Sequence, residues 1–164
     1  MSKVLATWFG VGYLRPGSGT WTSALAVLMG YLLHATLGFP GFAIVTLVVT
    51  AVGFWAIAKA LPTMTNPDPS EFVIDEVAGQ WIALLPASAG FWHAGLDPWN
   101  FPWPAWVGAF VLFRLFDIWK PGPVGWADRI EGPVGVMLDD IFAGIIAGFF
   151  LILAAGLYHG MLAR

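Results

Sequence analysis

Long apolar segments dominate the chain, and short polar stretches separate them. Five segments have the length and composition of helices, namely 21–38, 40–60, 77–92, 102–119 and 141–160. A helix needs about 20 mainly apolar residues to cross the hydrocarbon core of a bilayer. The second and fifth segments reach this length, and the first nearly does. The third starts directly after acidic residues and the fourth has a charged C-terminal part, so both are predicted to be short spans or helices buried within the bundle.

The composition is typical of a membrane protein. Of 164 residues, 59% are hydrophobic and 10% are charged, whereas a soluble domain has roughly 25% charged residues. A chain of this length has too little interior to bury so much apolar surface, so most of it is expected to face lipid. No internal repeat or low-complexity linker divides the sequence. We therefore predict an all-α, polytopic membrane helix bundle of about five helices, forming a single domain over residues 1–164.

The residue types that are missing or scarce exclude several kinds of site. The chain has no cysteine, which excludes disulfides, thiolate metal sites and cysteine nucleophiles. Its few Lys and Arg residues are dispersed, so nucleic-acid binding has no electrostatic support. The histidines, His34, His93 and His159, are scattered along the chain, and we expect them to be core or interfacial residues rather than nucleophiles.

Positive residues predict which loops share one side of the membrane. Before the C-terminus they lie near the N-terminus and around the ends of the second and fourth segments, at Lys3, Arg15, Lys59, Arg114, Lys120 and Arg129. The positive-inside rule therefore places the N-terminus and the loops 60–70 and 119–138 in the cytoplasm. Arg164 would then lie outside, against the rule. Apart from Asp97, the acids lie in or beside the cytoplasmic stretches, so a site that they form, such as an active site, is expected at the cytoplasmic interface.

The stretch PDPSEFVIDEVAGQW, residues 67–81, carries four carboxylates into a helical segment. Asp68 and Glu71 fit a capping box at a helix start, and capping alone would account for both. Asp75 and Glu76 lie two turns further in, where a structural ion pair is the alternative to a functional role. Acidic side chains at membrane depth are costly and mark function by default. We therefore predict that Asp75 and Glu76 belong to a site.

The stretch FRLFDIWKPGP, residues 113–123, places more charge near the same interface. Arg114 and Asp117 are separated by i, i+3, which suits either a shared site or a simple ion pair. Lys120 stands where the helix must end before a proline, and it suits either a site or a lysine that reaches from the apolar layer to the interface.

The stretch GVMLDDIFAGIIAG, residues 135–148, places Asp139 and Asp140 at the opening of the last predicted helix. The helix dipole favours an acid there by about 0.3–1 kcal/mol, and this accounts for one of the two. Two adjacent acids at the mouth of an otherwise uncharged helix indicate a cation site instead.

A glycine-rich turn, RPGSGTWTS at residues 15–23, precedes the first apolar segment. Backbone N–H groups at such a helix start suit a phosphate, although many such turns are only turns and the spacing is not that of a Walker loop. Oxygen ligands without cysteine suit a hard cation such as Mg²⁺, which proteins hold with a few carboxylates, water and substrate phosphate. Arg15, Arg114 and Lys120 supply positive charge for a phosphate ester.

These motifs resemble the signature blocks of the phosphatidylglycerophosphatase A family. The matching blocks are GSGTWTS, DPSEFVIDEVAGQWIALL, FRLFDIWKP and GVMLDDIFAG, which occur in the family's order over residues 12–148. The resemblance implies a multi-pass protein of the bacterial inner membrane. It also implies Mg²⁺-dependent removal of the terminal phosphate of phosphatidylglycerophosphate, giving phosphatidylglycerol. Thr22, Arg15 and Pro133 depart from the family's pattern, which puts loop conformation in doubt more than activity.

The family's functional positions fall on Thr20, Asp68, Glu71, Asp75, Glu76, Arg114, Asp117, Lys120, Asp139 and Asp140. We expect Mg²⁺ to be held by Asp75, Glu76, Asp139 and Asp140, with Glu71 and Asp117 next. Catalysis is expected from Asp75, Asp117, Asp139 and Asp140, and phosphate binding from Arg15, Thr20, Arg114 and Lys120. Whether water or an aspartate attacks phosphorus stays open at this stage.

Three other functions fit part of the pattern. A transporter or cation channel would also carry acids at membrane depth, but the outer halves of the predicted helices are apolar. A non-catalytic membrane scaffold would need none of the acids. The same chemistry on another lipid phosphate fits the motifs equally well. The partners expected are the phospholipid substrate and membrane lipids, without nucleic acid, and the sequence does not specify an oligomeric state.

Overall fold

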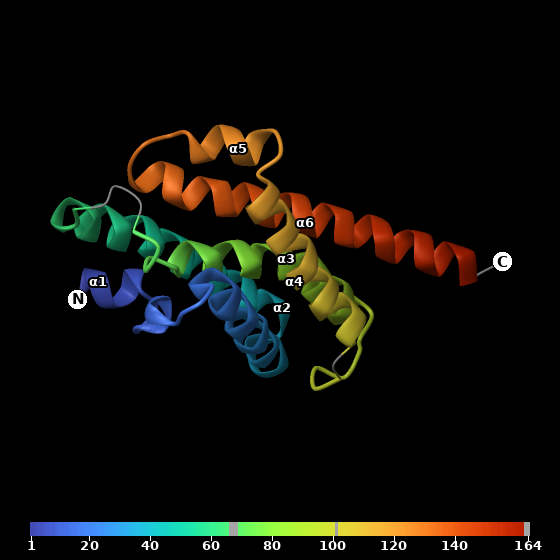
Figure 1. The fold of residues 1–164 in the computed structure, drawn as a ribbon. Helices are drawn as coiled ribbons and strands as arrows, with labels where there is room; N and C mark the ends of the chain where they lie inside the picture. The colour runs from blue at the N-terminus through green and yellow to red at the C-terminus, as the bar shows by residue number, and fades with distance from the viewer. Residues whose placement is uncertain (66–68, 101, 163–164) are drawn as a thin grey trace.

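The computed structural model describes residues 1–65, 69–100 and 102–162, with side chains up to Tyr158. Within these ranges the helices are α1 (Ser2–Ala6), α2 (Ser18–Ala60), α3 (Ile74–His93), α4 (Trp103–Trp119), α5 (Pro123–Asp128) and α6 (Pro133–Leu162). Two short 3₁₀ turns lie at Val11–Tyr13 and Leu61–Thr63. The described residues contain no strand, which confirms the all-α prediction (Figure 1).

α2 contains two of the predicted helices, joined by a sharp bend. Gly38 has φ 65° and ψ −178°, outside the helical range, and Pro40 follows shortly after. Glycine adopts a positive φ without steric cost. A Cβ at this position would also lie 2.2 Å from Cζ3 of Trp92. The boundary expected between segments 21–38 and 40–60 is therefore a bend that sends the two halves of α2 in different directions (Figure 1).

Two helical stretches among the described residues are long and apolar enough to cross a membrane by length and composition. They are Ser18–Thr63 and Pro133–Tyr158, whose mean hydropathies are 2.2 and 2.4. α6 extends past the rest of the bundle towards the C-terminus (Figure 1), and its residues 152–158 are all exposed. An apolar helix that is exposed on every side is typical of a membrane-embedded segment.

α3 is the central helix, packed between α2 and α6, and its side chains Ile74 and Trp81 are buried. α3 and α6 cross at two glycines. A Cβ on Gly144 would lie 2.3 Å from the carbonyl oxygen of Gly79, and a Cβ on Gly79 would lie 2.6 Å from the carbonyl oxygen of Asp140. The absence of side chains at this crossing brings the acidic part of α6 directly against α3.

The start of α3 differs from the prediction. The capping-box interpretation placed the helix start at Asp68, which lies outside the described residues. α3 instead begins at Ile74, with Val73 at its N-cap and no side-chain hydrogen bond to the cap. The interpretation of Glu71 as a capping residue of this helix was therefore wrong. Asp75 and Glu76 lie in the first turn of α3, where the helix dipole favours negative charge.

α6 starts earlier in the sequence than predicted, whereas α3 starts later. The helix begins at Pro133, directly after Gly132 with φ 86°. Proline suits the first helical position, because its φ is already helical and its missing N–H needs no partner there. Asp139 and Asp140 therefore lie well inside α6 rather than at its opening, and the dipole of the first turn does not account for either acid.

α4 ends at Trp119, with Lys120 as its C-cap, as the following proline predicted. Lys120 is left-handed (φ 50°, ψ 52°), and its N–H donates to the carbonyl oxygen of Phe116 at 2.8 Å. The short helix α5 then packs along α6 (Figure 1), with Val124 and Ala127 fully buried. This arrangement places the end of α4 and the whole of α5 beside the acidic half of α6.

Candidate functional site

A pocket of about 320 Å³ lies where the starts of α2 and α3 meet the end of α4 and the first half of α6. Its wall includes Ser18, Gly19, Asp75, Glu76, Asp117, Lys120, Asp139 and Asp140. Residues of the segments 69–73 and 128–136 complete it. Acids from three separate stretches of the sequence therefore line one cavity.

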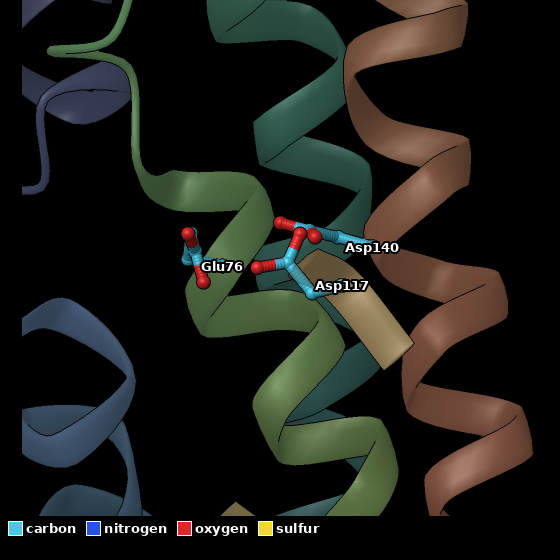
Figure 2. A group of neighbouring side chains, drawn as sticks. All are labelled: Glu76, Asp117 and Asp140. Atoms are coloured by element: carbon cyan, nitrogen blue, oxygen red, sulfur yellow. The ribbon is translucent and has the colours of Figure 1, made fainter. Parts of the chain in front are cut away.

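Three of these acids face one another. Glu76, Asp117 and Asp140 each offer a carboxylate oxygen, and these oxygens lie within 4.8 Å of one another. Figure 2 shows their side chains, which come from α3, α4 and α6 and point towards a common space. Asp140 is only 3% exposed. A compact group of oxygen ligands drawn from three helices has the chemistry that a hard divalent cation requires.

Arg114 joins two of these carboxylates. Its Nη1 lies 2.5 Å from Oε2 of Glu76 and 2.7 Å from Oδ2 of Asp117. The hydroxyl of Ser23 donates a further hydrogen bond to Oε2 of Glu76 at 2.8 Å. The i, i+3 ion pair of Arg114 and Asp117, which the sequence left open as a purely structural alternative, is present. It forms part of a larger cluster that links α2, α3 and α4.

Close packing explains the glycine at position 19, in the first turn of α2. A Cβ at this position would lie 1.9 Å from Oε1 of Glu76 and 3.1 Å from Nη1 of Arg114. Any side chain at Gly19 would therefore displace the Glu76 carboxylate. The glycine lets the backbone of α2 form one wall of the pocket without disturbing the cluster.

Lys120 reaches the pocket from the C-terminal end of α4. Its ammonium lies 2.8 Å from Oδ2 of Asp139 and also pairs with Oδ1 of Asp128. Partial burial by itself would lower the pKa of Lys120, but the hydrogen bonds and negative charges of Asp128 and Asp139 outweigh this effect and raise the pKa above its usual range. Lys120 therefore stays positively charged at any physiological pH.

The pocket holds more negative than positive charge. Asp75 and Asp140 are 8% and 3% exposed, and neither has a Lys or Arg ion-pair partner among the described residues. Oδ1 of Asp75 accepts the N–H of Glu76 at 3.0 Å, and Oδ1 of Asp139 accepts the N–H of Asp140 at 3.0 Å. Buried carboxylates are stable only when a cation or a proton compensates them. The residues of the pocket therefore fit a divalent cation.

Four residues expected in the site lie at its edge or outside it. Arg114 pairs with Glu76 and Asp117 but is not part of the pocket wall. Nη2 of Arg15 donates to the hydroxyl of Ser70 at 3.2 Å, and Ser70 lines the pocket. Thr20 is exposed on the first turn of α2 and is not part of the pocket wall. Glu71 is half-buried and also outside the wall, and its backbone carbonyl lies against Gly12.

Sequence reasoning missed several residues that line the pocket, among them Ser18, Ser70, Asp128 and Glu131. Asp128 and Glu131 lie in the loop region 119–138, which was assigned to the same membrane side as the acids. The shared membrane side was the only sequence signal that placed these residues near the acids. Loop residues have no periodicity, so the sequence does not show which of them face the pocket.

The described residues form an all-α fold, and its candidate site is a cavity lined by several carboxylates and by Lys120. Residues 4–155 match the family described as Phosphatidylglycerophosphatase A. The chain belongs to the phosphatidylglycerophosphatase A family, and it is a phosphatase. This finding favours an enzyme over the transporter and scaffold alternatives.

Curated relatives cover most of the chain. The "Phosphatidylglycerophosphatase A" of Haemophilus influenzae is 34% identical over 146 residues, which are 88% of this chain and 82% of the relative. The protein of the same name from Escherichia coli is 33% identical over 150 residues, 90% of this chain and 80% of the relative. A Bacteroides thetaiotaomicron protein named "Putative phosphatidylinositol-3-phosphatase" is 36% identical over 159 residues, 93% of this chain and 91% of the relative. No solved structure matches the chain.

Proposed function

We propose that the protein hydrolyses the terminal phosphate of phosphatidylglycerophosphate, with Mg²⁺, to give phosphatidylglycerol and inorganic phosphate. The observation that carries this proposal is the single pocket in which Glu76, Asp117 and Asp140 converge beside Arg114 and Lys120. Carboxylates that bind a cation, next to side chains that bind an anion, are the combination that phosphoryl transfer requires. The choice of phosphatidylglycerophosphate as the substrate rests on the names of two relatives.

Glu76, Asp117 and Asp140 would hold the Mg²⁺ ion, with Asp75 and Asp139 beside them in the same wall. All five are oxygen donors, as Mg²⁺ prefers. When bound, the ion would offset negative charge on the phosphoryl group. Glu71, which the sequence included among the ligands, lies outside the wall and is not part of this proposal.

The chain's own side chains would bind the phosphate and manage the proton. Lys120 lines the pocket, and Arg114 lies next to it, paired with Glu76 and Asp117; both would donate to phosphate oxygens. In the hydrolysis, the ester bond between phosphorus and the glycerol oxygen breaks, and that oxygen takes up a proton. A pocket aspartate such as Asp75 or Asp139 would accept a proton from the attacking water. Alternatively, it would attack phosphorus itself, and water would then hydrolyse the aspartyl phosphate to release inorganic phosphate.

The position of the pocket suits a substrate anchored in a bilayer. α2 and α6, which have the length and apolarity of membrane spans, both begin at the pocket end. A cavity of about 320 Å³ suits the polar head group, so the acyl chains of a phospholipid would stay in the surrounding lipid. The gathering of Lys and Arg around this end predicts a multi-pass inner-membrane protein with its active site on the cytoplasmic side.

The test compares phosphatidylglycerophosphate with a second lipid phosphate, because one relative is named "Putative phosphatidylinositol-3-phosphatase". Purified protein in detergent should release phosphate from phosphatidylglycerophosphate faster than from phosphatidylinositol 3-phosphate or phosphatidic acid. Excess EDTA should abolish release, and added Mg²⁺ should restore it. Faster release from the inositol lipid would overturn the head-group assignment, and full activity in EDTA would overturn the metal requirement.

A further inference from the structure

Lys120 has two carboxylate partners, and the proposed chemistry uses only one of them. The ammonium lies 2.8 Å from Oδ2 of Asp139, inside the carboxylate cluster, and also contacts Oδ1 of Asp128 at the end of α5. The side chains of Lys120 and Asp128 are 34% and 43% exposed, while that of Asp139 is 12% exposed. The lysine is therefore held between the inner wall of the pocket and its outer edge.

α5 fixes the position of Asp128 relative to Lys120. The left-handed backbone of Lys120 reverses the chain, and α5 packs so closely on it that a Cβ on Gly125 would lie 2.5 Å from the Lys120 carbonyl oxygen. Val124 is fully buried in the same apolar cluster as Phe116 of α4. Asp128, the last residue of α5, is thereby held beside the ammonium by the fold of the segment.

The geometry leaves one donor of Lys120 for a ligand. A lysine ammonium has three N–H groups, and Asp128 and Asp139 accept from it among the described residues. With Asp139 alone, the ammonium would be drawn towards the cluster of acids, where it would compete with a bound cation. A second carboxylate on the outer side balances this attraction and keeps the ammonium at the pocket wall.

We propose that Asp128 is a positioning residue, which holds Lys120 so that the remaining N–H binds an oxygen of a phosphate monoester in the pocket. This inference rests on the proposed function, since it takes the pocket to bind such a phosphate. Asp128 touches no reacting atom and acts through Lys120. Because the pair is partly exposed, it contributes little to folding stability, so its loss should affect phosphate affinity far more than thermal stability.

The first test is the variant Asp128→Asn, which removes the charge and keeps the shape. We expect KM for the lipid phosphate and the inhibition constant of inorganic phosphate to rise together, by about threefold to tenfold, since one charged contact of Lys120 is lost. The thermal midpoint should stay near that of the wild type. Asp128→Glu keeps the carboxylate and should recover most of the affinity. Glu131→Gln, which removes a charge from the same wall but no ion pair, should change both constants less.

A double-mutant cycle with Lys120→Met decides whether Asp128 acts through the lysine. In the Lys120→Met background, Asp128→Asn should cause no further rise in either constant, because the ammonium it positions is gone. Additive effects of the two substitutions would overturn the proposal. So would unchanged constants in Asp128→Asn alone, or a fall in thermal midpoint that accounts for the lost affinity.

Binding of inorganic phosphate, measured by calorimetry on the purified protein with Mg²⁺, separates this inference from the proposed substrate. If the wild type binds phosphate but does not hydrolyse phosphatidylglycerophosphate, the substrate assignment fails while the cycle can still support the role of Asp128. If phosphatidylglycerophosphate is hydrolysed and phosphate affinity does not depend on Asp128, the positioning role fails while the proposed function stands.

Discussion

At the scale of single residues, the pocket contains buried carboxylates whose desolvation is unfavourable for folding. Asp140 is 3% exposed and has no Lys or Arg partner among the described residues, and Asp75 is 8% exposed in the same pocket. Removing a buried charge that lacks a partner often raises stability, because the penalty of its desolvation disappears. Residues that are kept despite such a cost commonly serve function rather than folding.

This reasoning predicts opposite effects of Asp140→Asn on activity and stability. Phosphate release with saturating Mg²⁺ should fall by roughly 100-fold or more, on the scale of losing an electrostatic catalytic group. The thermal midpoint in EDTA should be equal to or higher than that of the wild type. Turnover close to the wild-type rate in the folded variant would remove Asp140 from the site. Asp97→Asn, far from the pocket in sequence and fold, is the matched control and should change neither quantity.

At the scale of elements, the site depends on how closely α3 and α6 approach. The crossing of Gly79 and Gly144 lets the backbones touch and brings Asp140 of α6 within reach of Glu76 of α3. A lateral shift of either helix by the width of a methyl group would separate the carboxylates. Helix packing therefore sets the arrangement of the carboxylates that are proposed to hold the cation.

Gly144→Ala should disturb this crossing, because the new Cβ would lie 2.3 Å from the carbonyl oxygen of Gly79. We expect a loss of about 1–3 kcal/mol of stability, as for other overpacked sites, and a weaker apparent affinity for Mg²⁺ in the phosphate-release assay. Gly156→Ala is the control on the same helix, since nothing lies within 4 Å of a Cβ there. Equal behaviour of the two variants would show that the crossing does not set the site.

At the scale of the whole molecule, the charges divide the bundle into a polar end and an apolar remainder. The pocket lies at the end that holds Arg114, Lys120 and Arg129, whereas Asp97 lies in the connection between α3 and α4. If α3 and α4 cross the bilayer, this connection and the pocket face opposite sides. Under the positive-inside rule, we then predict that the pocket faces the cytoplasm.

The absence of cysteine from the chain makes this topology directly testable. A cysteine introduced by Arg129→Cys should react with a membrane-impermeant thiol reagent only after the cells are opened. One introduced by Asp97→Cys should react in intact spheroplasts. Labelling of both positions from the same side would contradict the proposed multi-pass orientation. The unsubstituted protein is the control and should not react.

The sequence by itself determined the helical class, the boundary between apolar segments near Gly38 and the acids that are candidates for the site. Apolar runs and a Gly–Pro boundary are local signals, so they can be read without knowing what packs against what. The blocks around Asp75, Asp117 and Asp139 also carried the family resemblance, which the matches to known phosphatases confirm.

Only the tertiary structure decided which of those acids meet. The helix starts at Ile74 and Pro133 depend on tertiary packing and on turn residues, which hydrophobic periodicity does not reveal. For that reason the interpretation of Glu71 as a capping residue was wrong. The closeness of Glu76, Asp117 and Asp140 arises from helix crossings between distant segments. The contact of Asp128 with Lys120 depends on the fold of α5. Spacing along one helix predicts neighbours on that helix, but contacts between helices exist only after the bundle has packed.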